Sequence, residues 1–238
     1  MILKDRIIDL YHYATYNIYS LVIIGLVLFL CYEFLSFNFV VGALLSIILN
    51  GYGLEITRDT IKGGNRLPKM RFKPIIKGGV KLTIIASFFW LPITYFIIIL
   101  DDLVGYYIFS DIEISDLLLN SDALVVLFQQ NPVILLLCVL LFILVSYLSM
   151  FVYEMSLATL AETNSFLDAF NFKAIFKKIK SIGVKYYTIE YTELAIFIAF
   201  LSLLSILLRL SLFSAFISVL ILLLQFRIIG LIYIKAVE

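Results

Sequence analysis

Apolar residues gather in six long stretches, which are separated by shorter segments that carry most of the charge. A helix that crosses the hydrocarbon core of a bilayer needs about 20 mainly apolar residues. Six stretches reach or approach this length: Tyr19–Leu35, Phe37–Tyr52, Leu82–Leu100, Pro132–Val152, Tyr187–Leu208 and Ser211–Tyr233. The pattern therefore predicts an all-α membrane protein with six transmembrane helices, folded as a single transmembrane domain over residues 1–238.

Two further segments repeat apolar residues at helical spacing but are too polar to span a bilayer. Residues 2–14 carry the stripe Leu3, Ile7, Leu10, Tyr11 and Ala14. Residues 166–182 carry one apolar stripe and one stripe of lysines: Phe172, Ile175, Phe176, Ile179 and Ile182, then Lys173, Lys177 and Lys180. Helices of this kind lie flat in the interface, with their lysines toward anionic headgroups. We therefore expect cytoplasmic interfacial amphipathic helices here.

The composition agrees with lipid as the solvent for much of the chain. Hydrophobic residues make up 63% of the sequence and charged residues 15%, whereas soluble domains have about 45–50% and about 25%. The formal net charge is +1 at pH 7, so no excess of positive charge favours a nucleic acid partner.

Lysine and arginine concentrate in two of the connecting segments. The segment between spans three and four has none of them and is acidic instead. Because cytoplasmic loops are enriched in Lys and Arg, the two basic segments should lie inside and the acidic one outside. The sequence thus predicts a multi-pass protein of the cell membrane with both termini in the cytoplasm. Only Arg209, in the predicted outer turn between spans five and six, departs from the rule.

The two basic segments also resemble each other. Phe72–Lys77 aligns with Phe172–Lys177 at an offset of one hundred residues. Such a match indicates a candidate internal duplication with units 37–100 and 132–208. Both units would start with a descending span, so they would be parallel repeats about an axis along the membrane normal.

The duplication predicts equivalent local structure in its two copies. We expect a short helix that begins near Lys73 and ends at Gly78-Gly79, because glycine commonly ends helices. A longer helix should begin near Asn171 or Phe172. Phe72 and Phe172 should then occupy equivalent places.

The first basic segment carries the sharpest motif of the chain: Gly51-Tyr52, Thr57-Arg58, Thr60, Lys62-Gly63, Leu67-Pro68, Phe72 and Gly78-Gly79. This run resembles the signature of an uncharacterised domain family of small polytopic membrane proteins, mainly archaeal with some bacterial members. That family is more distantly similar to the membrane domain attached to some glycerophosphodiesterases. The resemblance covers most of the chain and implies the family's fold and a membrane location. No activity is established for the family, so the resemblance implies no catalytic residue.

The sequence offers no constellation for catalysis or metal binding. It lacks the G-x-x-x-x-G-K-[ST], H-E-x-x-H and G-x-S-x-G motifs. His12 is the sole histidine, and Cys31 and Cys138 both lie in apolar stretches. We therefore predict no enzymatic activity, no cofactor and no metal. Gly63-Gly64 could cradle a phosphate, but a turn that ends a helical extension of span two is the favoured interpretation.

Ionisable residues inside predicted spans stand out, because charge in hydrocarbon is costly and normally turns inward. Glu190 and Glu193 lie near the inner end of span five, and Arg227 lies at a similar depth in span six. Adjacent antiparallel spans would pair the acids with Arg227, either as a structural lock or in a transport or proton pathway. Asn50, near the inner end of span two, could join either.

These observations favour a non-enzymatic membrane module that engages anionic headgroups of the inner leaflet, a partner protein or a second copy of the chain. The candidates for facing anionic lipid are cations of the basic segments: Lys173, Lys177, Lys178, Lys180, Arg58, Lys62 and Arg66. The alternative is a small-solute transporter or channel, which rests on the repeat and on the polar residues of the inner half. A transporter should show a polar-lined cavity that reaches the middle of the bilayer, and a lipid module should show a dry core.

Overall fold

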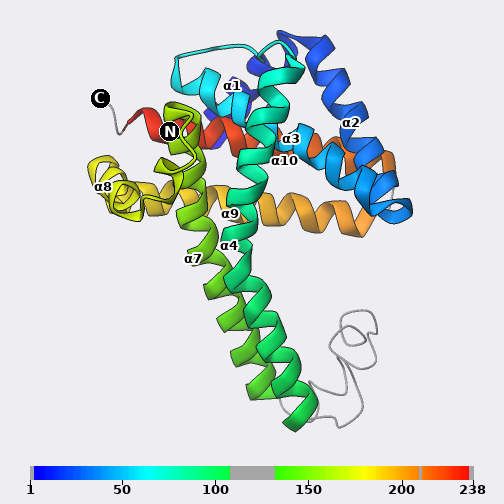
Figure 1. Cartoon of the computed structure of the whole chain (residues 1–238), viewed down its shortest axis with the longest axis vertical. Helices are drawn as coiled ribbons and strands as arrows, with labels where there is room; N and C mark the ends of the chain where they lie inside the picture. The colour runs from blue at the N-terminus through cyan, green and yellow to red at the C-terminus, as the bar shows by residue number, and fades with distance from the viewer. Residues whose placement is uncertain (1–2, 108–131, 209–210, 236–238) are drawn as a thin grey trace. The chain divides into compact units, whose positions relative to one another are not determined.

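The computed structural model describes residues 3–107, 132–208 and 211–235. Within these ranges the chain forms eight α-helices and one short 3-10 helix, with no strand. Figure 1 shows the helices: α1 (Leu3–Thr15), α2 (Ile18–Phe37), α3 (Phe39–Ile61), α4 (Phe72–Tyr107), α7 (Pro132–Thr163), η1 (Asp168–Phe170), α8 (Phe172–Ile182), α9 (Val184–Leu208) and α10 (Ser211–Ile234). The predicted all-α class is confirmed.

Five of the described helices are long and apolar enough to cross a membrane: α3, α4, α7, α9 and α10. A sixth crossing is obtained if the end of α1 and most of α2, which meet at 93°, count as one bent span. The predicted edges at Pro132, Leu208 and Ser211 coincide with helix ends. The fourth span was predicted to end at Val152, but α7 continues to Thr163. The count of six spans stays a prediction.

The chain divides into two compact units, Met1–Ile85 with Glu154–Glu238, and Ala86–Tyr153. In the first unit, α3 packs against α2 and α10, and α10 also packs against α2 and α9. Asn38 alone separates α2 from α3, and its side chain accepts hydrogen bonds from the amides of Val40 and Val41. This cap satisfies amides that have no partner at a helix start, so the chain can reverse without a longer loop.

Glycines bring α3 and α4 into direct backbone contact. A Cβ atom at Gly51 would lie 1.9 Å from the carbonyl oxygen of Ile75, and one at Gly79 would lie 2.0 Å from that of Ile47. Small residues permit such close approach between membrane helices. The prediction that Gly78-Gly79 ends a short helix is therefore wrong, because Gly79 serves the packing of α4 while the helix continues to Tyr107.

The opposite contact of α3, with α10, also depends on small residues. A Cβ at Gly53 would overlap the ring of Phe226 at 2.3 Å, and one at Gly230 would lie 2.7 Å from Cβ of Thr60. Thr57 Oγ1 donates to the Phe226 carbonyl at 2.9 Å. Glycine and threonine thus place α3 against helices on two sides.

The second unit contains the later part of α4 and the first part of α7. The rings of Phe89 and Tyr153 contact each other, with centroids 5.8 Å apart. Val139, Leu140 and Leu141 on α7 are about half exposed. Contiguous apolar exposure on a helix suits a lipid environment.

One expectation from the candidate duplication concerns where helices begin in the two copies. Helices α4 and α8 begin at Phe72 and Phe172, the residues that the alignment pairs. The first copy then continues as one helix, whereas the second ends at Ile182 and restarts at Val184. The duplication itself stays a prediction.

Candidate functional site

Helix α8 presents a mixed apolar and basic outer face. Asn171 caps its start by accepting from the Ala174 amide at 3.1 Å, and Gly183 ends it with a φ of +94°. In the apolar stripe, Ile175 and Ile179 are buried and Ile182 is partly exposed, whereas Phe172 and Phe176 are 39% and 48% exposed. Lys173, Lys177 and Lys180 are exposed as well. The outer face thus carries two aromatic rings beside three cations.

Lys178 differs from its neighbours, because it is bound within the protein. Its Nζ lies 2.5 Å from Glu162 Oε2 and 4.3 Å from the ring centroid of Tyr233. The Tyr233 hydroxyl donates to the same carboxylate oxygen at 2.6 Å. Of the four lysines predicted to face lipid on α8, three therefore remain on the outer face.

Arg58, in the first basic segment, is also bound within the protein. Its Nε donates to the Ala161 carbonyl at 3.1 Å, and its terminal nitrogens reach Glu55 and Asn164. Lys81 Nζ donates to the Asn164 carbonyl at 2.6 Å. Arg58 therefore joins α3 to α7 and to the residues that follow α7.

The residues after α3 form the predicted turn. Gly63 has a φ of +80°, a conformation that glycine adopts readily. The amides of Gly63 and Gly64 donate to the carbonyls of Thr60 and Asp59 at 2.9 and 2.8 Å. These donors close the helix end, so the arrangement favours the turn over a phosphate cradle. Lys62 at this turn is exposed.

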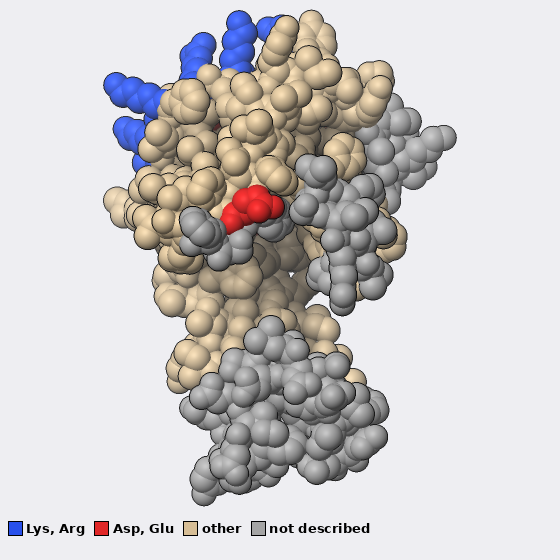
Figure 2. All heavy atoms as spheres, turned by 90° about the vertical axis from the view of Figure 1, so that its right-hand side faces the viewer, with Lys and Arg blue, Asp and Glu red and all other residues tan. Residues whose placement is uncertain are grey.

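A polar cavity of about 580 Å³ lies beside the segment that follows this turn. Arg66, Lys69 and Arg71 line it together with Glu55 and Asp59. Arg66 stacks its guanidinium carbon 5.7 Å from the ring centroid of Tyr16. Figure 2 shows lysine and arginine side chains gathered at one edge of the visible face.

Arg227 is the most heavily bonded buried cation among the described residues. Its Nε and one terminal nitrogen bond both carboxylate oxygens of Asp9 at 3.2 and 3.4 Å. The other terminal nitrogen donates to Thr60 Oγ1 at 3.1 Å and to the Gly64 carbonyl at 2.6 Å. The guanidinium also lies 4.1 Å from the ring centroid of Tyr13. Arg227 thereby holds α1, α3 and α10 together.

The predicted partner of Arg227 is wrong. The ion pair is made with Asp9 on α1, and Glu193 is exposed on α9. The prediction compared only how deep Glu193 and Arg227 lie in the bilayer along their own spans. Such a comparison contains no information about α1, which packs beside α10. Glu190 is buried at 4% exposure.

Two other polar contacts join helices inside the first unit. Asn50 Nδ2 donates to Thr83 Oγ1 at 3.2 Å, which connects α3 with α4. Gln225 Nε2 donates to Glu154 Oε1 at 2.6 Å, and Glu154 is 4% exposed. Glu154 was not among the residues predicted from the sequence, because it lies on α7 beyond Val152, the predicted end of the fourth span. The uncharged and mainly apolar stretch from Met155 to Ala161 was the available signal.

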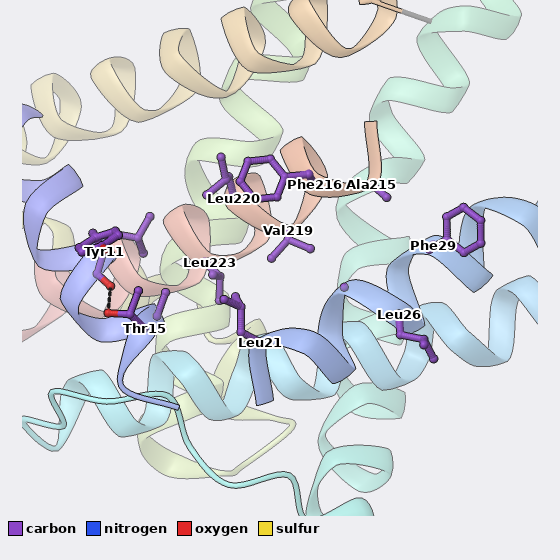
Figure 3. A pocket seen from close by; sticks show the side chains of 13 residues that line it. Tyr11, Thr15, Leu21, Leu26, Phe29, Ala215, Phe216, Val219, Leu220 and Leu223 are labelled. Atoms are coloured by element: carbon purple, nitrogen blue, oxygen red, sulfur yellow. Dashed lines mark hydrogen bonds between the residues drawn. The ribbon is translucent and has the colours of Figure 1, made fainter. Parts of the chain in front are cut away.

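An apolar groove of about 640 Å³ runs between α1, α2 and α10 (Figure 3). Leucine, alanine, valine and phenylalanine make up most of its wall. Its thirteen residues are Leu10, Tyr11, Ala14, Thr15, Leu21, Gly25, Leu26, Phe29, Ala215, Phe216, Val219, Leu220 and Leu223. No group of three or more potential metal ligands occurs in the part of the chain that the structure describes.

A family model described as a protein of unknown function (DUF4013) matches residues 34–210. No curated protein and no solved structure gives a significant match. The expected resemblance to a family without a known activity is confirmed.

Proposed function

This chain belongs to the DUF4013 family, and we propose that it is a non-enzymatic multi-pass module of the cell membrane that binds anionic lipid headgroups. The outer face of α8 is the observation that carries the proposal. Phe172 and Phe176 can enter the boundary between headgroups and acyl chains, while Lys173, Lys177 and Lys180 meet the phosphates. No catalytic role is assigned to any residue.

The expected strength follows from the charge near the membrane surface. Each Lys or Arg close to an anionic leaflet contributes about 1 kcal/mol, and the effect fades within a Debye length of about 8 Å at physiological salt. Lys178 adds little, because its charge is already balanced by Glu162. Three lysines then amount to an affinity difference of roughly two orders of magnitude.

The first test replaces Lys173, Lys177 and Lys180 by glutamine together. The protein in detergent should lose most of the thermal stabilisation that added phosphatidylglycerol gives the wild type, because three phosphate contacts are gone. Phosphatidylcholine should stabilise both proteins equally little. The matched control replaces the same lysines by arginine and should keep the response. Equal stabilisation of wild type and the glutamine variant by phosphatidylglycerol would count against the proposal and leave a partner protein as the occupant of this face.

The second test concerns orientation, which we propose from the charge distribution. A single cysteine at Asp111, in a background without Cys31 and Cys138, should react with a membrane-impermeant thiol reagent on intact cells. A single cysteine at exposed Lys69 should react only after the cells are opened. Asp111 lies outside the described residues, so the test uses only the reaction of the introduced thiol with the reagent. The reverse labelling pattern would place the basic segments outside and defeat the orientation.

The transporter alternative has one observation in its favour, the buried contact between Glu154 and Gln225. A polar group inside a span commonly marks a substrate or ion pathway. The polar cavity, however, is lined by residues of the 66–71 segment and of the last turns of α3, and the groove beside α2 is apolar. Both features support the lipid module as the first choice.

A further inference from the structure

The apolar groove between α1, α2 and α10 has a shape that suits a chain-like ligand. It extends along α2 from Leu21 to Phe29 and along antiparallel α10 from Leu223 to Ala215. Figure 3 shows Tyr11 and Thr15 at one end of it and Phe29 at the other. Its volume of about 640 Å³ falls within the range of about 300–1,000 Å³ of small-molecule pockets.

The wall of the groove is almost entirely apolar. Thr15, the one hydroxyl other than that of Tyr11, donates to the Tyr11 carbonyl at 2.8 Å, so its hydrogen is already used (Figure 3). Gly25 lines the groove without a side chain, and a Cβ at this position would lie 3.8 Å from Val219 Cγ2. A wall of this kind offers dispersion contacts and no unsatisfied polar group to an apolar ligand.

The surroundings of the groove determine what can enter it. Helix α10 and the bent pair α1–α2 are candidate membrane spans. Leu26 and Phe216 at the rim are 59% and 60% exposed, so the groove opens outward on the surface of these spans. In a bilayer that surface meets hydrocarbon, and the available occupant is an acyl chain.

The two ends of the groove differ in polarity, which gives the ligand a direction. At the α1 end the wall includes Tyr11, which is 65% exposed, and the next residue along the chain, His12, is exposed too. Beyond Thr15, Arg66 lies over the ring of Tyr16. The far end, between Phe29 and Phe216, is wholly apolar. A headgroup therefore belongs at α1 and a chain terminus at the phenylalanines.

We propose that the groove between α1, α2 and α10 binds one acyl chain of a membrane phospholipid, with the ester end at α1 and the chain terminus between Phe29 and Phe216. This site is separate from the outer face of α8, and it does not depend on headgroup charge. Gly25 is the determining residue, because any side chain larger than alanine at this position projects into the space that the chain occupies.

The probe is phosphatidylcholine with a diazirine at the end of one acyl chain, incorporated into nanodiscs with the full chain. After photolysis, adducts are mapped by mass spectrometry of peptides. In the wild type, labelling per residue should be several-fold higher around Leu26–Phe29 and Ala215–Phe216 than around Val139–Leu141 of α7, which reports ordinary bilayer contact. Equal labelling of the three regions would overturn the proposal.

Variants make the test specific. Gly25→Leu should lower the groove adducts several-fold and leave the α7 adducts unchanged, whereas Gly25→Ala should behave like the wild type. Leu220→Trp, which covers the groove from α10, gives the same expected loss if Gly25→Leu fails to fold. Unchanged groove labelling in Leu220→Trp, or adducts that join two copies of the chain, would overturn the assignment. In a competition experiment, excess unlabelled phospholipid should lower the groove labelling. If excess free oleate lowers it and excess unlabelled phospholipid does not, phospholipid is not the ligand.

Discussion

Replacing Gly79 by alanine is expected to destabilise the protein severely, while the same replacement at adjacent Gly78 leaves it folded. A methyl group at Gly79 would meet the Ile47 carbonyl oxygen at 2.0 Å, and backbone cannot rotate away. At Gly78 the nearest atom is Leu54 Cδ2 at 3.1 Å, the end of a flexible side chain. We expect a loss of about 3 kcal/mol for Gly79→Ala and a change within about 1 kcal/mol for Gly78→Ala.

The measurement is unfolding by sodium dodecyl sulfate titrated into detergent micelles, followed by helix circular dichroism. Both variants make the same chemical change in the same turn of α4, so helix propensity is equal in the two. Their difference therefore isolates the contact between α3 and α4. Equal stability of the two variants would mean that these helices do not approach each other through Gly79.

Replacing Arg227 by methionine should lower the unfolding free energy by about 3 kcal/mol. Methionine replaces the apolar stem of Arg227 but lacks the guanidinium, so the bonds to Asp9, Thr60 and the Gly64 carbonyl are lost. The expected loss is at the lower end of the range for buried ion pairs, because Asp9 is 39% exposed and can be hydrated. The same titration in micelles gives the value.

Two control variants separate geometry from charge. Arg227→Lys keeps the charge but cannot form the forked contact with Asp9, so most of the loss should persist. Glu193→Gln should have almost no effect, because Glu193 is exposed and Arg227 is paired elsewhere. An effect of Glu193→Gln as large as that of Arg227→Met would restore the pairing that the sequence suggested.

The sequence predicts the helices far better than their contacts. Apolar runs place α10 to within one residue at both ends and the end of α9 at Leu208, because hydropathy depends on local composition alone. The end of α3 was also predictable, since Gly63-Gly64 and Leu67-Pro68 are strong breakers. The length of α7 was not, because Glu154 interrupts an apolar run that in fact continues. A charged residue in an apolar run suggests the end of a membrane span when the residue that binds it, here Gln225, is unknown.

The sequence could not show which residues contact each other between distant helices. Asp9 and Arg227 are 218 residues apart, and no local pattern indicates that α1 lies beside α10. The glycines posed the same problem. Gly79 in a basic segment suggests a helix end, whereas its function in the fold depends on Ile47, a residue of another helix.

The position of α3 between glycine contacts on two sides has a consequence for how the chain is made. Its contact with α4 can form as soon as both helices have left the ribosome, because they are neighbours in sequence. Its contact with α10 joins residues as distant as Thr57 and Phe226, which are 169 positions apart. Until α10 has been synthesised, the face of α3 around Gly53 lacks the helix that covers it. Helix α10 thus completes the packing of a helix that was synthesised much earlier.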